Sequence, residues 1–247
     1  MFHSLYHRID IAQTARRIWR RGDPELHYLK VLAGEGRRAL DIGANRGVFA
    51  YWMSKAFSAV EAFEPNPNLA RALKLAAFRG VSVHDVALSD TRGESELLIP
   101  AHRKGGLDTP SAHLQVAGDD CAAAAKFTVK LARLDDFAFG DVDFIKIDVE
   151  GFEEQVLSGG AETIAKWRPI LLIELIDRLR PGCRARVEKR LGAIGYQSWF
   201  LDEGRWRPLG ELGSGETTPS GRFVPNYLFV PAERRGAIEL EGAQASR

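Results

Sequence analysis

The 247-residue sequence has few cysteines and no long apolar run. Its two cysteines, Cys121 and Cys183, belong neither to a Cys-x-x-Cys pair nor to a Cys/His cluster, which argues against a disulfide framework and a structural zinc. No run approaches the roughly 18 apolar residues that cross a bilayer, and the N-terminus lacks the apolar centre of a signal peptide. These absences predict a cytoplasmic protein.

The sequence also lacks an excess of charge of one sign. Its 34 basic and 33 acidic residues leave a formal net charge of +1, so no field of the whole molecule attracts nucleic acid. Hydrophobic residues make up 45% of the chain and charged residues 27%, which is ordinary for a globular protein. At this length the chain can bury the core of one α/β domain.

After Gly36 the sequence alternates between short apolar runs and helical segments. The candidate strands are Arg38–Ile42, Ala59–Phe63, Val81–Val86, Asp143–Val149, Ile170–Leu175, Gln197–Leu201 and Tyr227–Val230. The candidate helices between them are Val48–Phe57, Leu69–Phe78, Phe152–Ile164 and Arg184–Gly192. The middle strands are almost continuously apolar, as strands buried on both faces are. This alternation predicts an α/β fold with a doubly wound, mostly parallel sheet.

Two helices are predicted before this domain. The first, Leu5–Arg21, has apolar residues at roughly helical spacing and five arginines between them: Arg8, Arg16, Arg17, Arg20 and Arg21. This helix either packs on the domain with a solvated basic face or makes peripheral contact with an anionic membrane. The second helix, Asp23–Leu32, begins with a favourable N-cap, Asp23, followed by proline.

The stretch from about residue 89 to 141 interrupts the alternation. It is rich in glycine and contains strand-like pieces at Glu94–Ile99 and Lys126–Leu131. Long insertions between sheet strands often serve as lids or substrate loops. We therefore divide the chain into an N-terminal helical extension (1–36), a main domain (37–231) with this insertion as a lid (89–141), and a flexible tail (232–247).

The loop after the first strand has glycines, but not the complete dinucleotide fingerprint. In ALDIGANRGVFA, Gly43 and Gly47 follow a strand that ends in Asp41, and the middle glycine of GxGxxG is missing. Asp41 would repel a pyrophosphate, which disfavours NAD. S-adenosylmethionine has no phosphate and carries an ammonium and a sulfonium that Asp41 can complement. The alternative for this loop alone is a tight turn in which Asp41 caps the helix.

Acids also follow the next two strands. In AVEAFEPNP, Glu64 stands 23 positions after Asp41, where an acid can accept hydrogen bonds from a ribose diol, and Pro65 restricts the chain behind it. Asp85, or less favourably Asp90, is a candidate for the adenine amine, with Val86 beside the ring. The alternative for such an acid is a solvated turn residue. Asp41 and Glu64 together favour a nucleoside site.

Charged residues interrupt an otherwise buried strand in DFIKIDVEGFEEQVLSGG. Lys146 and Asp148 alternate with apolar residues, and Glu150 follows. The alternative to a functional role is a buried pair of Lys146 with Asp148 or Glu150, since residues two apart share a strand face. Glu174 ends the next strand in PILLIEL, so Asp148 and Glu174 are expected on one rim. Such acids can take a proton from a hydroxyl or hold a divalent metal.

Seven motifs follow one another along about residues 38–231: LDIGANRG, FEPNP, VALSD, LARLDDF, IKIDVEGFEEQVLSGG, PILLIEL and PNYLFVP. This order resembles the FkbM family of S-adenosylmethionine-dependent methyltransferases. The resemblance implies a Rossmann-like class I methyltransferase fold, with helices on both faces of a seven-stranded, mostly parallel sheet whose last strand is antiparallel. It also implies O-methyl transfer to a hydroxyl of a sugar, glycan or polyketide-like natural product. The N-terminal helix and residues 89–127 lie outside it.

The resemblance assigns Asp41, Gly43, Asn45, Gly47 and Glu64 to the cofactor and Asp148 and Glu150 to the acidic signature, and the strand-end patterns above add Pro65, Asp85, Val86 and Glu174. The cofactor-binding candidates are Asp41, Gly43, Asn45, Gly47, Glu64, Pro65, Asp85 and Val86. The catalytic candidates are Asp148, Glu150 and Glu174, of which Asp148 is the leading candidate to orient or deprotonate the acceptor. Magnesium would suit the strand-end acids, but no third ligand stands out. His84, His102 and His113 are alternative bases.

We therefore expect an O-methyltransferase that uses S-adenosylmethionine on a small-molecule or glycan hydroxyl. The alternatives are another small-molecule or lipid-linked acceptor, a non-catalytic cofactor-binding module and, disfavoured by Asp41, an NAD-dependent oxidoreductase. A nucleic-acid methyltransferase is disfavoured by the near-neutral charge, and we expect no nucleic-acid partner. The sequence specifies neither the acceptor nor metal dependence nor oligomeric state.

Overall fold

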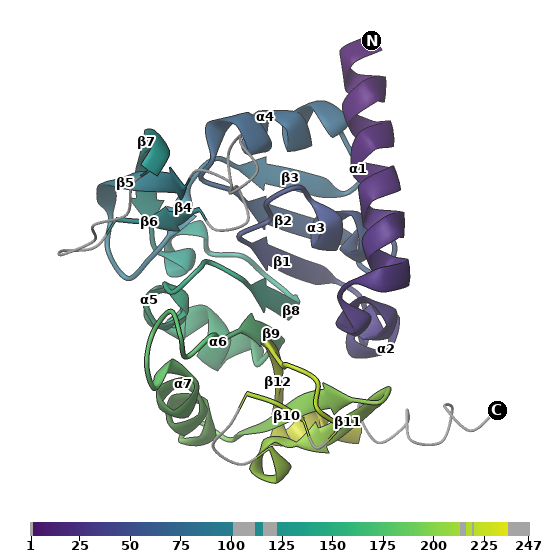
Figure 1. The fold of residues 1–247 in the computed structure, drawn as a ribbon, viewed down its shortest axis with the longest axis vertical. Coiled ribbons are helices and arrows are strands. Elements are labelled where there is room, and N and C mark those ends of the chain that lie inside the picture. Colours follow the sequence, from purple (N-terminus) through teal and green to yellow (C-terminus); the bar gives the residue numbers. More distant parts are fainter. Residues whose placement is uncertain (1, 101–111, 116–122, 213–215, 219, 237–247) are drawn as a thin grey trace.

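The computed structural model describes residues 2–100, 112–115, 123–212, 216–218 and 220–236, and an eight-stranded sheet forms its centre (Figure 1). The strand order is β11-β10-β12-β9-β8-β1-β2-β3. The bounds are β1 (Arg38–Ile42), β2 (Ala59–Phe63), β3 (Val81–His84), β8 (Val142–Ile147), β9 (Ile170–Glu174), β10 (Tyr196–Asp202), β11 (Arg205–Pro208) and β12 (Asn226–Pro231). All seven strands expected from the sequence are present, so the α/β prediction is confirmed.

Strand direction in this sheet follows the expected pattern, with one addition. β1 runs parallel to both β2 and β8, and β12 runs antiparallel to β9 and β10. The eighth strand, β11, pairs only with β10 at the sheet edge. The sequence did not reveal it because Arg205–Pro208 is polar and ends in proline, unlike a buried strand. Strand order reverses beside β1, where sheets of this kind bind ligands at their carboxyl edge.

Helices cover both faces of the sheet. One face carries α1 (Phe2–Arg21), the 3₁₀ helix η1 (Pro24–Tyr28), α2 (Leu29–Leu32), α3 (Val48–Met53) and α4 (Pro67–Ala76). The other carries α5 (Glu153–Gly159), α6 (Ala161–Trp167) and α7 (Cys183–Gly192). Because side chains alternate along a strand, Ala39 packs on the first face and Leu40 on the second. The helix expected over residues 152–164 is divided at Gly160, which lies between α5 and α6.

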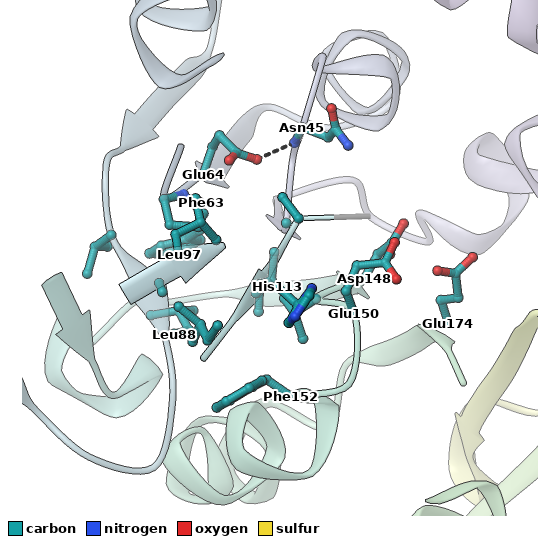
Figure 2. A pocket seen from close by; sticks show the side chains of 18 residues that line it. Asn45, Phe63, Glu64, Leu88, Leu97, His113, Asp148, Glu150, Phe152 and Glu174 are labelled. Carbon is teal, nitrogen blue, oxygen red and sulfur yellow. Dashed lines mark hydrogen bonds between the residues drawn. The ribbon is translucent and has the colours of Figure 1, made fainter. Parts of the chain in front are cut away.

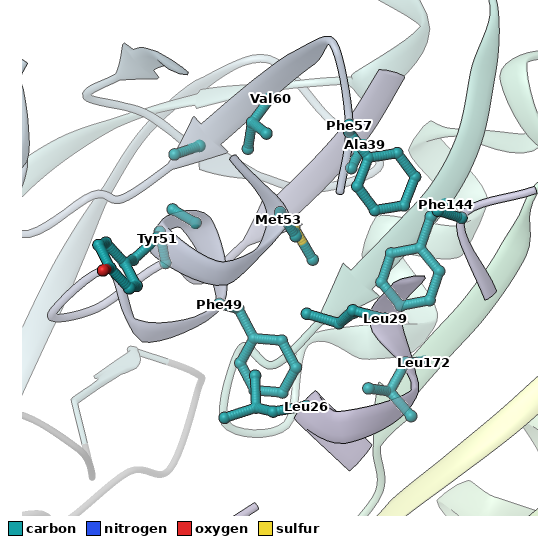
Figure 3. Packing of buried hydrophobic residues seen from close by; sticks show 14 of the residues in the cluster. Leu26, Leu29, Ala39, Phe49, Tyr51, Met53, Phe57, Val60, Phe144 and Leu172 are labelled. Atoms are coloured by element: carbon teal, nitrogen blue, oxygen red, sulfur yellow. The ribbon is translucent and has the colours of Figure 1, made fainter. Parts of the chain in front are cut away.

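The N-terminal segment shares the core of the first face. Leu26 and Leu29 are buried beside Phe49 and Leu172 (Figure 3). The segment Asp23–Leu32 is not one α-helix but η1 followed by α2, and the side chain of Asp23 makes no capping hydrogen bond. The N-cap expectation is therefore correct for the position of Asp23 and wrong for its side chain.

The insertion forms a second sheet, in the order β4-β7-β5-β6. Its strands are β4 (Ala87–Leu88), β5 (Gly93–Pro100), β6 (His113–Leu114) and β7 (Ala123–Ala132). β5 and β7 are the strand-like pieces expected from the sequence, and they pair antiparallel. A small core holds this sheet together: Ala87, Leu97, Leu114 and Val129. Residues 101–111 and 116–122 lie outside the described part of the chain, with His102 and Cys121 among them.

Three 3₁₀ helices complete the fold: η3 (Leu134–Phe137), η4 (Leu209–Glu211) and η5 (Ala232–Arg234). The predicted tail begins with η5, and its last part, 237–247, is outside the described residues. Across the described residues, every helix is too short or too polar to span a membrane.

Candidate active site

Two cavities meet at the carboxyl edge of the large sheet. The first, of about 210 Å³, lies between this edge and the second sheet. The second, of about 250 Å³, lies between the loop after β1 and the N-terminal segment. Gly43, Asn45 and Asp148 line both. The two cavities therefore form one elongated site with a common junction.

Asp41 lies at the bottom of the second cavity. Its side chain is 1% exposed, and burial raises its pKa to about 7. One carboxylate oxygen accepts a hydrogen bond from the Ala50 backbone. The other, Oδ2, is buried and has no hydrogen-bond partner among the described residues. The helix-cap alternative thus accounts for one oxygen of Asp41 and leaves the other facing a cavity.

The loop after β1 depends on glycine at two positions. The backbone N–H groups of Gly43 and Ala44 both donate to the Phe63 carbonyl, at 3.0 and 2.9 Å. Gly43 has φ +82°, and a Cβ there would lie 1.8 Å from the Asp148 carbonyl oxygen. Gly47 has φ +75° and packs on Leu73, so it shapes the turn without lining either cavity. At position 43, only glycine permits the close approach of the ends of β1 and β8.

Glu64 lies in the first cavity with both oxygens engaged by the backbone (Figure 2). Its Oε2 accepts from the Asn45 N–H at 2.6 Å, and its Oε1 accepts from the Asn66 N–H at 2.8 Å. Burial raises the pKa of Glu64 to about 7. Each carboxylate oxygen has a second lone pair, so Glu64 can still accept hydrogen bonds from a ligand diol.

The third strand contributes one of its two candidates. Val86 lines the first cavity, as does Pro65 after β2. Asp85 does not, because its carboxylate turns outward, 66% exposed, to form an ion pair with Lys74 of α4 at 2.8 Å. The structure therefore corrects the assignment of Asp85 to the adenine amine and favours its alternative as a surface residue.

Three acids gather at the junction of the cavities. The carboxylates of Asp148, Glu150 and Glu174 each place an oxygen within 4.8 Å of the others (Figure 2). Burial and, next, the charge of Asp148 raise the pKa of Glu174, so Glu174 holds a proton that Asp148 can share. The same spacing suits a divalent cation. The third possible ligand was missed because only the left-handed backbone at Glu150, φ +52°, turns this residue toward the other two.

Lys146 is buried beside this cluster, and three polar groups surround its ammonium. Its Nζ donates to Asn226 Oδ1 at 3.0 Å and to the Ile147 carbonyl at 3.4 Å, and it lies 3.5 Å from Asp148 Oδ2. Burial alone would lower its pKa, but neighbouring acids, Asp148 first, raise it instead. The predicted Lys146–Asp148 pair is therefore present, and it orients Asp148 at the rim of the cavity.

The second sheet gives the first cavity an apolar wall, whose individual residues sequence reasoning did not single out when it assigned the insertion as a lid. This wall comprises Leu88, Leu97, Ala112, Leu114 and, from the segment after β8, Phe152. The apolar run at Leu97–Ile99 was a signal for a buried strand, but nothing in it indicated what the strand would face. Figure 2 shows Leu88, Leu97 and Phe152 away from the acids, which cluster at the other end.

The three histidine candidates differ in their position relative to the first cavity. His113 lines the first cavity. His84 does not, because its Nε2 lies 2.9 Å from Glu61 Oε2 and its ring stacks on Phe63. His102 is among the residues that the structure does not describe.

Comparisons with known proteins agree with these features. Residues 41–187 match the model of the methyltransferase FkbM domain. The methyltransferase sdnD of Sordaria araneosa is 28% identical over 209 residues, which cover 68% of this chain and 76% of that relative.

Solved structures are more distant. An FkbM methyltransferase from Methylobacillus flagellatus is 17% identical, with a TM-score of 0.49. The matched part covers 79% of this chain but only 44% of that longer chain. A TehB-like methyltransferase from Corynebacterium glutamicum is 14% identical with a TM-score of 0.42, over 92% of this chain and 98% of its own. The family match covers more than half of the 247 residues and includes the end of β1, the glycine loop and all three acids, so this chain belongs to the FkbM methyltransferase family.

Proposed function

We propose that the protein is an S-adenosylmethionine-dependent O-methyltransferase whose acceptor is a hydroxyl of a sugar, glycan or natural product. The observation that carries this proposal is a pair of buried, unpartnered oxygens on two residues that line the second cavity. Among the described residues, Asp41 Oδ2 and Asn45 Oδ1 both lack a hydrogen-bond partner. Leaving such acceptors unpaired is costly, and a ligand that donates hydrogen bonds or carries positive charge removes the cost.

The residues present fit this cofactor along the whole site. Asp41 and Asn45 suit its cationic amino-acid end, Glu64 suits the ribose diol, and Pro65 and Val86 suit the adenine face. The acidic Asp41 also disfavours a pyrophosphate at this loop. When bound, S-adenosylmethionine supplies an electrophilic methyl group on a sulfonium.

The position of Asp148 supports a role in accepting the acceptor proton. A neutral hydroxyl becomes a good nucleophile only as its proton leaves, so a base at the junction of the two cavities is needed. Lys146 orients Asp148 from below, and the Glu174 proton can be shared with it. We assign Asp148 as the group that accepts the hydroxyl proton, with Glu150 and Glu174 beside it.

The first cavity supports an acceptor that combines an apolar body with a hydroxyl. Its far wall is apolar, through Leu97, Leu114 and Phe152, while its near end holds the three acids. A lipid-linked acceptor would use the same wall and is the second candidate.

Calorimetric titration with S-adenosylhomocysteine tests the cofactor. We expect saturable binding of this thioether and none of NAD. Glu64→Gln is expected to weaken binding about ten-fold or more, because it removes a charge-assisted acceptor from the ribose. Glu94→Gln, an exposed residue of β5, is the matched control and should bind normally. Binding of NAD in place of the thioether would overturn the proposal.

Substitution of Asp148 tests the chemistry. Asp148→Asn is expected to bind S-adenosylhomocysteine normally and to lose methyl transfer by a factor of about 100 or more, the usual contribution of a general base. Full activity in this variant would remove Asp148 from its assigned role. Activity is expected to persist in EDTA. Loss in EDTA with recovery in Mg²⁺ would instead assign Asp148, Glu150 and Glu174 to a divalent cation.

A further inference from the structure

The N-terminal segment forms part of the second cavity. Ile18 of α1 and Asp23, in the turn between α1 and η1, line it together with Asp41 and Lys146. Both residues precede position 41, where the match to the FkbM domain begins. The family domain alone therefore does not enclose this end of the site.

The position of Asp23 is fixed by packing on both sides. Before it, Trp19 stacks on His27 with ring centroids 4.3 Å apart, and His27 Nε2 lies 2.7 Å from the Trp19 carbonyl oxygen. After it, Leu26 and Leu29 are buried in the core (Figure 3). Asp23 is thus held at the cavity by the Trp19–His27 stack on one side and by the buried Leu26 and Leu29 on the other.

The Asp23 carboxylate has no direct partner among the described residues. Within the part of the chain that the structure describes, it makes neither a capping hydrogen bond nor an ion pair. Its pKa is raised, chiefly by burial. The charge of Lys146 offsets this only in part, because its ammonium already donates to Asn226 Oδ1 and the Ile147 carbonyl and pairs with Asp148. The cavity therefore contains two carboxylates, of Asp23 and Asp41, with capacity for a cation.

A ligand with a primary ammonium matches this arrangement. An ammonium has three donors and can bridge two carboxylates, each through a charge-assisted hydrogen bond. Arg46 is exposed at the rim of the same cavity, where it can meet a carboxylate. Two acids within and a guanidinium at the rim complement an amino-acid zwitterion.

We propose that Asp23, together with Asp41, binds the α-ammonium of the cofactor's amino-acid end, which makes the N-terminal segment a wall of the cofactor site. This inference rests on the proposed function. It adds a binding residue that lies outside the matched domain and that serves the cofactor, not the acceptor.

Two ligands that differ only at the amino-acid end test it. S-adenosylhomocysteine carries the amino acid, and 5′-methylthioadenosine keeps the nucleoside thioether without it. Asp23→Asn is expected to bind S-adenosylhomocysteine about ten-fold more weakly or worse and 5′-methylthioadenosine as the unchanged protein does. Asp23→Glu should recover part of the affinity. Asp10→Asn, on the exposed side of α1, should change neither.

Equal loss for both ligands in Asp23→Asn would show that Asp23 only supports the fold, and unchanged affinity for both would show that it does not touch the cofactor. Either result overturns the inference and leaves the proposed function standing. Failure of the unchanged protein to bind either ligand would instead refute the proposed function itself.

Discussion

At the scale of single residues, Gly43 decides how closely β1 and β8 approach. A Cβ at this position would lie 1.8 Å from the Asp148 carbonyl oxygen, and φ is +82°. We expect Gly43→Ala to lower the free energy of unfolding by about 2 kcal/mol or more, since it adds a left-handed backbone penalty to a backbone clash. It should also abolish thioether binding. Chemical denaturation and calorimetry measure the two effects.

The matched control is Gly192→Ala. A Cβ at Gly192, the last residue of α7, meets nothing within 4 Å, so stability and binding should be unchanged within about 0.5 kcal/mol. A Gly43→Ala protein as stable as this control would mean that the strand ends can separate without cost, contrary to the packing described above.

The residue scale also shows what the sequence could reveal. Asp41 and Glu64 were predictable because carboxyl ends of parallel strands lie on one edge, whatever follows them. Asp85 was not, because its partner Lys74 comes from α4, whose orientation the sequence leaves open. Asp23 was not predicted as a site residue because an aspartate before proline already satisfies the N-cap pattern, whether or not its side chain caps the helix.

At the scale of elements, α1 presents an outer face that is largely exposed among the described residues. Leu5, Tyr6 and Ile9 are exposed toward its N-terminal end. The exposed side chains of Arg16, Arg17 and Arg20 follow, and none of the three forms an ion pair with a described residue. The expectation of peripheral membrane contact stays a prediction. We expect binding to phosphatidylglycerol vesicles, weakened by salt, and none to phosphatidylcholine vesicles.

Replacing these three arginines by serine should abolish vesicle cosedimentation. Serine at Lys166, Lys189 and Arg205, exposed positions on other elements, removes the same charge and is the control. Equal loss in both triple variants would show that net charge alone matters. Failure of the unchanged protein to bind phosphatidylglycerol vesicles would favour the solvated-face alternative.

The strands were predicted more accurately than the helices, and the reason is physical. A strand such as β9 is an almost continuous apolar run buried on both faces, so its ends coincide with a change of composition. The division between α5 and α6 depends on contacts of Gly159 with the Ser89 carbonyl, far away in sequence. The formation of β11 likewise depends on a contact and not on its own composition, because this strand pairs only with β10.

At the scale of the whole molecule, the site carries a stability cost that depends on pH. Burial raises the pKa of Asp41 and of Glu64 to about 7, above their ordinary values near 4. Between about pH 4 and 7 the folded state therefore binds more protons than the unfolded state, so stability falls as the pH rises, by about 1.4 kcal/mol per unit of pKa shift at the limit. Thermal unfolding should show a lower Tm at pH 8 than at pH 5.5.

The cofactor's ammonium should offset part of this cost once Asp41 is ionised. The rise in Tm given by S-adenosylhomocysteine is therefore expected to be larger at pH 8 than at pH 5.5. Asp41→Asn should flatten the pH dependence of the free protein. An identical slope in that variant would attribute the pH dependence to other carboxyl groups.

The two ends of the insertion are joined where they leave the large sheet. β4 pairs with the end of β7, and the Ser89 N–H donates to the Ala132 carbonyl at 2.9 Å. A segment closed at its base can lengthen, shorten or change sequence while the strands beneath keep their register. Under the proposed function, the insertion that contacts the acceptor is thus a module closed at its own base, separate from the strands whose ends form the cofactor site. Changes of acceptor would then require changes in this module only, with the register of the large sheet and the cofactor site left as they are.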